Sequence, residues 1–233
     1  MRESPSAFLV QFDQAAPADR NLPGVLARLT HEMAEPLGAI ESIAYYLRMV
    51  LPKEDERAQR HLERIEELVA SMNGTLGDAV QYLRDAPLEP QVLDLHALIG
   101  EALGERPIAA VPAFRLEMSS EPAFIRVDAG QGRHLLRSLL NLFRGLSSRC
   151  EDVHIRTFTE GAAVTVEFTA MGLNATRAEV EVMFEPFGKG FCEGSGLALA
   201  SARRILESNG GRITVGSDNG RDLSLRGAFP FAG

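Results

Sequence analysis

The sequence predicts a two-part α + α/β fold, in which an antiparallel helical hairpin forms a dimeric four-helix bundle and is followed by a two-layer α/β sandwich. Two long stretches with a helical spacing of apolar residues occupy residues 22–86. A segment with two prolines and no periodicity follows at residues 87–91. From residue 92 to residue 233, alternating strand patterns are interleaved with shorter helical patterns, which is typical of helices packed on one face of a mixed sheet.

Residues 1–21 are expected to form an N-terminal arm or a short helix, because prolines interrupt them and only Phe8–Phe12 could pack. The first long helix is expected from Pro23 to Leu51, since a proline in the first turn lacks only an N–H that would stay unbonded there. Its apolar positions recur at steps of three or four residues, at Leu26, Leu29, Met33, Leu37, Ile40, Ala44, Leu47 and Leu51.

A second long helix is expected at residues 56–84, after a turn at residues 52–55. Its apolar stripe repeats every seven residues, at Leu62, Ile65, Val69, Met72, Leu76, Ala79 and Leu83. Two antiparallel helices with such stripes cannot bury both of them within one hairpin. The sequence therefore predicts a homodimer, in which two copies of the region 22–86 pair as a four-helix bundle.

The third region, residues 92–233 after the linker 87–91, shows the patterns of strands and helices in alternation. Strands are expected at residues 92–95, 114–118, 124–127, 153–157, 163–169, 212–215 and 223–229, with a hairpin turn at Glu160-Gly161. Helices are expected at residues 96–103, 131–146, 176–183 and 196–208. Asn209-Gly210-Gly211 ends the last of them.

Composition excludes several classes of protein. The chain has 233 residues and a net charge of −8, whereas nucleic-acid binders normally carry a basic patch. No apolar run approaches the roughly 20 residues of a membrane span, and Met1 does not begin a signal-peptide pattern. Cys150 and Cys192 show neither disulfide nor metal spacing. We therefore expect a cytoplasmic protein with reduced thiols, no metal site, no membrane span and no nucleic-acid partner.

The candidate reactive group is His31, which lies in the first helical pattern directly before Glu32. At about 100° per residue, His31 lies about 200° from the apolar positions at Leu29 and Met33, so its imidazole points away from the buried stripe. Pro36 cannot donate a hydrogen bond to the Glu32 carbonyl and is expected to bend the helix. The alternative for a lone histidine is an ordinary solvated side chain on a bundle helix.

The run His31-Glu32-x-x-x-Pro36-Leu37 resembles the phospho-acceptor box of two-component sensor histidine kinases. The resemblance implies that His31 accepts a phosphoryl group on a ring nitrogen. It also implies that Glu32 orients the ring or takes its proton.

The third region resembles the ATP-binding domain of the same kinases, whose wider family includes the gyrase ATPases. The run Gly194-Ser195-Gly196-Leu197-Ala198-Leu199 is similar to the family's glycine-rich box, where free N–H groups at a helix start favour phosphate. Met183–Phe187 matches the Phe-Glu-Pro-Phe box, and Lys189 falls in the short lid after it. The nucleotide-contacting residues implied by the resemblance are Gly172, Lys189, Gly194, Ser195, Gly196 and Asn141.

Two further boxes depart from the family pattern. Ala170 stands where a carboxylate accepts the adenine amino group, and only Gly172 keeps its glycine in that box. An ungapped fit of the helix box places Leu142 where an asparagine holds Mg²⁺, and leucine offers no oxygen ligand. A one-residue slip would place Asn141 there instead, and this alternative stays open.

An intact acceptor helix with an altered nucleotide site resembles the dimeric histidine phosphotransferases built on a kinase scaffold. The sequence thus predicts a phosphorelay protein that passes a phosphoryl group between His31 and the aspartates of response-regulator receiver domains, with impaired or absent ATP binding and no required cofactor. The alternatives are an active ATP-dependent kinase core with a divergent site, which would need ATP and Mg²⁺, and a dimeric docking scaffold without phosphate chemistry.

Overall fold

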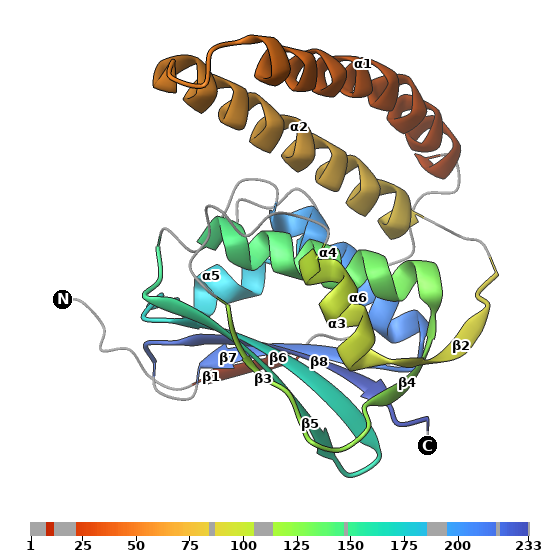
Figure 1. The fold of residues 1–233 in the computed structure, drawn as a ribbon. Helices are drawn as coiled ribbons and strands as arrows, with labels where there is room; N and C mark the ends of the chain where they lie inside the picture. The colour runs from red at the N-terminus through yellow and green to blue at the C-terminus, as the bar shows by residue number, and fades with distance from the viewer. Residues whose placement is uncertain are drawn as a thin grey trace. The chain divides into compact units, whose positions relative to one another are not determined.

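The computed structural model describes residues 8–11, 22–83, 87–104, 114–146, 149–185, 195–217 and 220–232. The chain divides into two compact units, Pro17–Arg84 and the pair of segments Met1–Ala16 and Asp85–Gly233. We refer to them as the helical hairpin and the sheet domain (Figure 1). The helical part followed by an α/β part confirms the predicted fold class.

The helical hairpin consists of α1 (Leu22–Val50) and α2 (Glu56–Leu83), which run antiparallel to each other. Helix α1 continues through Pro36 without interruption. The Asp55 side chain accepts a hydrogen bond from the Ala58 N–H and so caps the start of α2. Both helices lie within a few residues of the bounds that the apolar spacing predicts.

The sheet domain has two layers, with helices covering one face of the main sheet (Figure 1). The main sheet has six strands in the order β1-β7-β8-β6-β5-β3, and β2 pairs with β4 in a separate two-stranded sheet. The strands are β1 (Phe8–Gln11), β2 (Pro90–Asp94), β3 (Arg115–Glu117), β4 (Phe124–Asp128), β5 (Asp152–Glu160), β6 (Ala163–Met171), β7 (Arg212–Ser217) and β8 (Leu223–Pro230). The helices are α3 (Leu95–Gly104), α4 (Ala129–Leu146), α5 (Arg177–Val182) and α6 (Ser195–Ser208).

The core lies between the helices and the covered face of the sheet. Alternate residues of β6, from Val164 through Phe168 to Ala170, are buried there at 0–1% exposure. Phe168 stacks on Phe143 of α4, with ring centroids 5.2 Å apart. The other residues of β6 point to the sheet face that no helix covers, which we call the open face.

The N-terminal segment differs from the arm or short helix that the sequence predicts. Residues Phe8–Gln11 form strand β1, which pairs antiparallel with β7 at the edge of the main sheet. Without β1, β7 would be the edge strand and would present unpaired N–H and C=O groups, which a short extended segment can satisfy. Strand β2 likewise begins at Pro90, inside the segment 87–91 that the sequence marks as a linker.

The turn after α6 gives a prediction about stability. A Cβ atom at Gly211 would lie 2.4 Å from the Ala228 carbonyl oxygen, so the backbone would have to shift. We expect Gly211→Ala to lower the free energy of unfolding by about 1–3 kcal/mol in a urea titration. A matched control is Gly100→Ala in α3, where a Cβ meets nothing within 4 Å, and we expect that variant to be as stable as the parent or more so. Equal stability of the two variants would contradict the prediction.

Candidate functional site

The His31 and Glu32 side chains are exposed on α1, as the helical spacing predicts. The residues that flank them on the inner side of the helix behave differently, since Met33 is half-buried and Leu37 is 4% exposed. The helix therefore holds the imidazole toward solvent while the opposite side packs. A ring in this position is open to a partner molecule.

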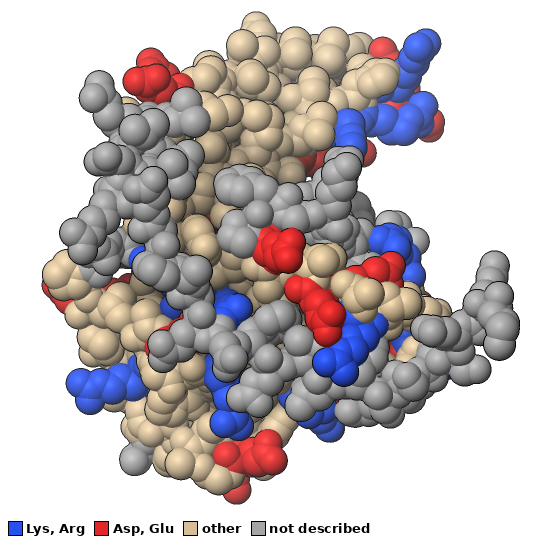
Figure 2. All heavy atoms as spheres, turned by 180° about the vertical axis from the view of Figure 1, so that it is seen from behind, with Lys and Arg blue, Asp and Glu red and all other residues tan. Residues whose placement is uncertain are grey.

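The helical hairpin also exposes an apolar stripe on each helix. On α1, Ile40 and Ile43 are 43% and 59% exposed, and on α2 Ile65 and Met72 are 36% and 44% exposed. The residues that alternate with these, such as Leu62 and Val69, are buried. Figure 2 shows a broad face of the helical hairpin without charged side chains. Each helix thus buries part of its predicted apolar stripe and leaves the rest exposed, so one hairpin does not bury both stripes completely, as the sequence predicts.

The counterpart of the base-reading box lies at the end of β6. Ala170 is fully buried between Val153 of β5 and Leu223 of β8. Gly172 has a φ of 72°, and its N–H donates to the Asp222 carboxylate at 2.8 Å. Within this box, the residue at the family's carboxylate position offers no hydrogen-bond acceptor on its side chain.

The counterpart of the metal-holding box lies on α4. Leu142 is 7% exposed and belongs to the apolar core. Asn141 is half-buried, and its Oδ1 accepts a hydrogen bond from Arg144 Nη1 at 3.2 Å. The apolar position at Leu142 supplies no oxygen for Mg²⁺, and the oxygen of Asn141 already has a cationic donor beside it.

The glycine-rich box and the lid are described in part. Lys189 and Gly194 lie outside the described residues. Ser195 begins α6, and Gly196 is buried in the first turn of that helix. Phe184, from the Phe-Glu-Pro-Phe run, is 5% exposed and packs in the core. The described residues of the two kept boxes therefore lie at the start of α6 and in the core near α5.

A polar network that the sequence did not predict joins the ends of two helices. The Asp128 carboxylate accepts from the Gln131 N–H at 3.0 Å and caps α4. Asn209, just after α6, accepts from the Asp128 N–H at 3.0 Å and donates to Gln131 Oε1 at 2.7 Å. Asp128 Oδ2 also accepts from the Glu89 N–H at 3.3 Å. These contacts join residues far apart in sequence, and no local pattern predicts them.

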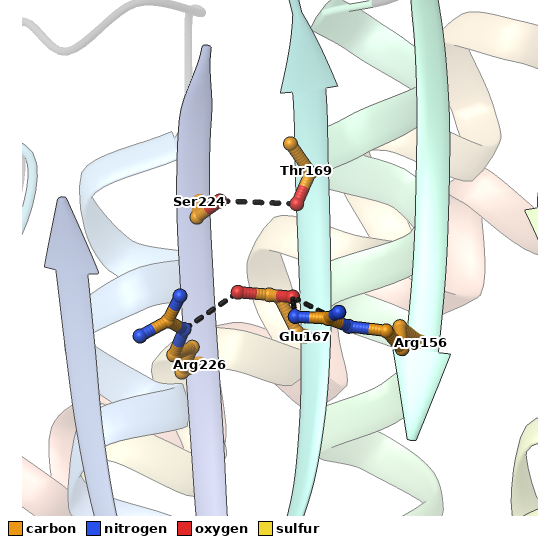
Figure 3. Close-up of polar contacts among 5 residues, drawn as sticks. All are labelled: Arg156, Glu167, Thr169, Ser224 and Arg226. Atoms are coloured by element: carbon orange, nitrogen blue, oxygen red, sulfur yellow. Dashed lines mark hydrogen bonds and ion pairs between the residues drawn. The ribbon is translucent and has the colours of Figure 1, made fainter. Parts of the chain in front are cut away.

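The open face of the sheet carries a second unpredicted cluster (Figure 3). Glu167 of β6 has a side chain that is 6% exposed and lies between two arginines. Arg156 Nη2 of β5 donates to it at 2.7 Å, and Arg226 Nε of β8 donates at 2.5 Å. Thr169 and Ser224 form a hydroxyl pair beside them at 3.0 Å.

Arg156, Glu167, Thr169 and Ser224 line a shallow hollow of about 480 Å³ together with residues of β3. Two of the arginines in the hollow have carboxylate partners, since Arg156 pairs with Glu167 and Arg115 forms an ion pair with Asp152. We therefore assign the cluster a structural role, in which it joins β5, β6 and β8 across the open face.

Further features of the described residues concern Cys150, metal ligands, membrane spans and surface charge. Burial, together with the nearby Asp152 carboxylate, raises the pKa of the Cys150 thiol above its usual value, so this free cysteine is protonated at neutral pH. Among the described residues, no group of His, Cys, Asp and Glu is arranged to hold a metal ion, and no helix is long and apolar enough to cross a membrane. Figure 2 shows Lys and Arg side chains scattered among Asp and Glu rather than gathered in a basic patch on the described part of that face.

Comparison with known proteins shows which proteins have a similar sequence and fold. No family model matches the chain. Sensor histidine kinase ZraS of Klebsiella oxytoca is 28% identical over 213 residues, which cover 89% of this chain and 46% of ZraS. Sensor histidine kinase AruS of Pseudomonas aeruginosa is 30% identical over 249 residues, which cover 94% of this chain and 25% of AruS. The chain is a homologue of the two-component sensor histidine kinases.

The histidine kinase homologue spans less than half the length of the curated relatives that it matches. Solved structures agree in fold. Full-length ShkA in complex with AMPPNP has a TM-score of 0.65 at 22% identity, and the match covers 90% of this chain and 46% of ShkA. The catalytic domain of histidine kinase ThkA has a TM-score of 0.52 at 21% identity, and the match covers 61% of this chain and 96% of that domain.

The open-face cluster of this kinase homologue gives a second stability prediction. Glu167→Ala leaves two guanidinium groups without their carboxylate, and these are 47% and 35% exposed. Because water can hydrate these partly exposed guanidinium groups, we expect the free energy of unfolding to fall by about 1–3 kcal/mol, less than for a fully buried pair. Glu160→Ala, at an exposed position of the hairpin turn, is the matched control and should leave unfolding unchanged. Urea titrations of both variants measure the difference, and a loss equal to that of the control would contradict the assigned role.

Proposed function

We propose that the protein is a two-component phosphorelay protein that takes a phosphoryl group on His31 and passes it to or from an aspartate of a response-regulator receiver domain. The observation that carries this proposal is the exposed His31-Glu32 pair on α1, in a chain that aligns over 89% of its length with sensor histidine kinase ZraS. The alternative of an ordinary solvated histidine does not account for the kinase-like domain that follows in the same chain.

The proposed transfer follows from the chemistry of imidazole. An unprotonated ring nitrogen of His31 attacks the phosphorus of a receiver aspartyl phosphate. A P–N bond forms, the P–O bond to the aspartate breaks, and the aspartate leaves as a carboxylate. The ring carries positive charge after the attack, and the Glu32 carboxylate next in the chain stabilises it or takes the proton from the other ring nitrogen. The return transfer reverses these steps.

The face of α1 that carries His31 also exposes apolar side chains farther along the helix. Met49 is 18 residues after His31, five full helical turns, so it lies on the same face of α1. Met49 and Tyr45 are 65% and 63% exposed. Exposed apolar side chains on the face of the reactive histidine support docking of a receiver domain there.

We further propose that ATP binding is impaired or absent. With Ala170 in place of the carboxylate, a bound adenine amino group would be buried without an acceptor, which costs about 1–3 kcal/mol. The buried Leu142 supplies no ligand for Mg²⁺. These residues do not fit a magnesium–nucleotide at the two positions that fix the base and the metal.

An active ATP-dependent kinase core is the second candidate function. It is favoured by the curated relatives, which are named as sensor histidine kinases, and by the fold match to ShkA, whose structure holds AMPPNP. In this case the helix box would align one residue earlier, so that Asn141 takes the metal position. Its Oδ1 would then have to give up the hydrogen bond from Arg144. A docking scaffold without phosphate chemistry is the third candidate.

One experiment separates the three candidates. The purified protein is incubated with γ-labelled ATP and Mg²⁺, and separately with a receiver domain carrying labelled phosphate. The phosphorelay proposal expects label on His31 from the receiver and none from ATP. Label from ATP would identify an active kinase and contradict the proposed loss of ATP binding. No label from either source would leave the scaffold.

We also propose that the helical hairpin dimerises as a four-helix bundle. The exposed stripe of Ile40, Ile43, Ile65 and Met72 supports this proposal, because a second hairpin would remove these side chains from water.

A further inference from the structure

Glu35 is the carboxylate that shares the face of α1 (Leu22–Val50) with His31. Residues four apart lie about 40° from each other around a helix and have Cβ atoms about 5–6 Å apart, whereas the adjacent residue Glu32 lies about 100° away. Helical side chains also lean toward the N-terminus, so the side chain of Glu35 lies over the turn that contains His31. Both side chains are exposed. The carboxylate of Glu35 is therefore close to any group that is bonded to the ring.

The charges of α1 around His31 are negative. Residues 30–47 include three glutamates and no lysine or arginine. An ion pair of 2.9 Å between Arg48 and Glu66 sets the part of α1 before residue 48 beside the part of α2 after residue 66. In residues 68–83 of α2 the one charged residue is Asp78, which is 5% exposed. The facing half of α2 thus adds no positive side chain to this part of the helical hairpin.

A phosphoryl group on His31 would enter these negative surroundings. A phosphate bonded to a side chain carries about −1.5 to −2 charges at pH 7. The Glu35 carboxylate, with its Cβ about 5–6 Å from that of His31, repels this charge and raises the free energy of phosphohistidine. Before the transfer, the same carboxylate stabilises a positively charged ring. Both effects favour His31 without phosphate, and water and salt limit them to a few-fold because the groups are exposed.

We propose that Glu35 destabilises phosphohistidine at His31, so that the phosphoryl group rests on the receiver aspartate and occupies His31 only in passing. The proposal rests on the proposed function for the identity of the partner, whereas the repulsion at the ring does not. In the step that is favoured, the P–N bond to His31 breaks and a P–O bond to the receiver aspartate forms. The ring nitrogen recovers the electron pair of the broken bond. Glu35 forms no bond and moves no proton in this step, since it acts through its charge alone.

Two matched variants of the full chain test the role of this charge. Glu35→Gln removes the charge and keeps the size of the side chain. Glu41→Gln is the control, because Glu41 is exposed on the same helix but lies ten residues from His31. This separation is about 15 Å, which exceeds the screening length of about 10 Å at 0.1 M salt. Glutamate and glutamine have similar helix propensities, so circular dichroism should show both variants to be as helical as the parent.

The first measurement needs no receiver. Phosphoramidate phosphorylates exposed imidazoles and releases ammonia, and the phosphorus NMR signal of phosphorylated His31 is then followed against pH. In Glu35→Gln its titration midpoint should lie about 0.3–0.5 pH units lower, because a nearby negative charge opposes the second ionisation of the phosphoryl group. The midpoint in Glu41→Gln, and that of phosphorylated His61 on α2 in every form, should not move. An unchanged midpoint in Glu35→Gln, or a His31 that phosphoramidate does not label, would overturn the proposal.

The second measurement is the division of label between the receiver and His31 once the two proteins have reached equilibrium. Glu35→Gln should raise the ratio of label on His31 to label on the receiver about threefold at 0.1 M salt, and this difference should vanish at 1 M salt. Glu41→Gln should match the parent. A ratio that does not change, or a change that salt does not reduce, would overturn the effect on transfer. If no form exchanges label with the receiver, the proposed function fails, while the titration still decides whether Glu35 repels the phosphoryl group.

Discussion

His31→Ala is expected to reduce the label that the protein takes from a phosphorylated receiver domain to background. The imidazole nitrogen is the only group in the proposed reaction that forms a bond to phosphorus, so no neighbouring side chain replaces it. The side chain is exposed, and its removal should leave the helical content and the thermal unfolding of the protein unchanged. Acid-labile label separated on a gel measures the transfer, and circular dichroism measures the fold.

The matched control is His61→Ala, which removes an exposed histidine from α2 instead of α1. This variant should be labelled as fast as the parent. Glu32→Gln should slow labelling by about 100-fold and flatten its dependence on pH, because the amide neither takes a proton nor balances the charge of the ring. Full labelling of His31→Ala, or loss of labelling in His61→Ala, would contradict the assignment of His31.

Ile43→Glu together with Met72→Glu is expected to convert the protein from a dimer to a monomer. Both residues belong to the exposed apolar stripe, one on each helix, at 59% and 44% exposure. Within one chain the new carboxylates reach water, but in the bundle they would be buried without partners, which costs several kcal/mol at each position. The mass in solution should fall from 50.8 kDa, twice the 25.4 kDa of one chain, to 25.4 kDa.

Tyr45→Glu is the control for this prediction, since it introduces the same charge on the other side of α1. Tyr45 is two residues from Ile43, about 200° around the helix, and is 63% exposed. This variant should remain a dimer by light scattering. It should also take label from the receiver more slowly, because Tyr45 lies on the face of His31. A monomeric Tyr45→Glu variant would show that the interface is on the face of the histidine and would contradict the proposed bundle.

Local sequence patterns predicted most of the fold because each helix and strand buries one side. The alternation of β5 and β6 determines which residues face the core, and these faces agree with the structure. On α2 the seven-residue spacing agrees in part, because Leu62 and Val69 are buried whereas Ile65 and Met72 are exposed.

The pairing of Arg156 with Glu167 follows from the two-residue turn at 161–162, across which Glu160 pairs with Ala163. A shift of the turn by one residue would have separated them, so the sequence alone left this pair unidentified.

Contacts between distant segments were not predictable in the same way. Asn209 and Asp128 meet because two helices end beside each other, and neither residue belongs to a periodic pattern of its own. Strand β1 forms because β7 has a free edge, which is a property of the assembled sheet and not of residues 8–11. The box positions at Ala170 and Leu142 were predicted as altered, and the structure places both in apolar surroundings. Lys189 and Gly194 lie outside the described residues and stay predictions.

The ladder of opposite charges on the open face, with Glu167 between Arg156 and Arg226, has a consequence for crowding in solution. Where these ion pairs lie, the sheet surface offers little apolar area for another molecule to pack against. Breaking the ion pairs to form such a contact would be unfavourable. Contacts between two copies through the open face should therefore be short-lived, which is consistent with the proposed dimerisation through the helical hairpin.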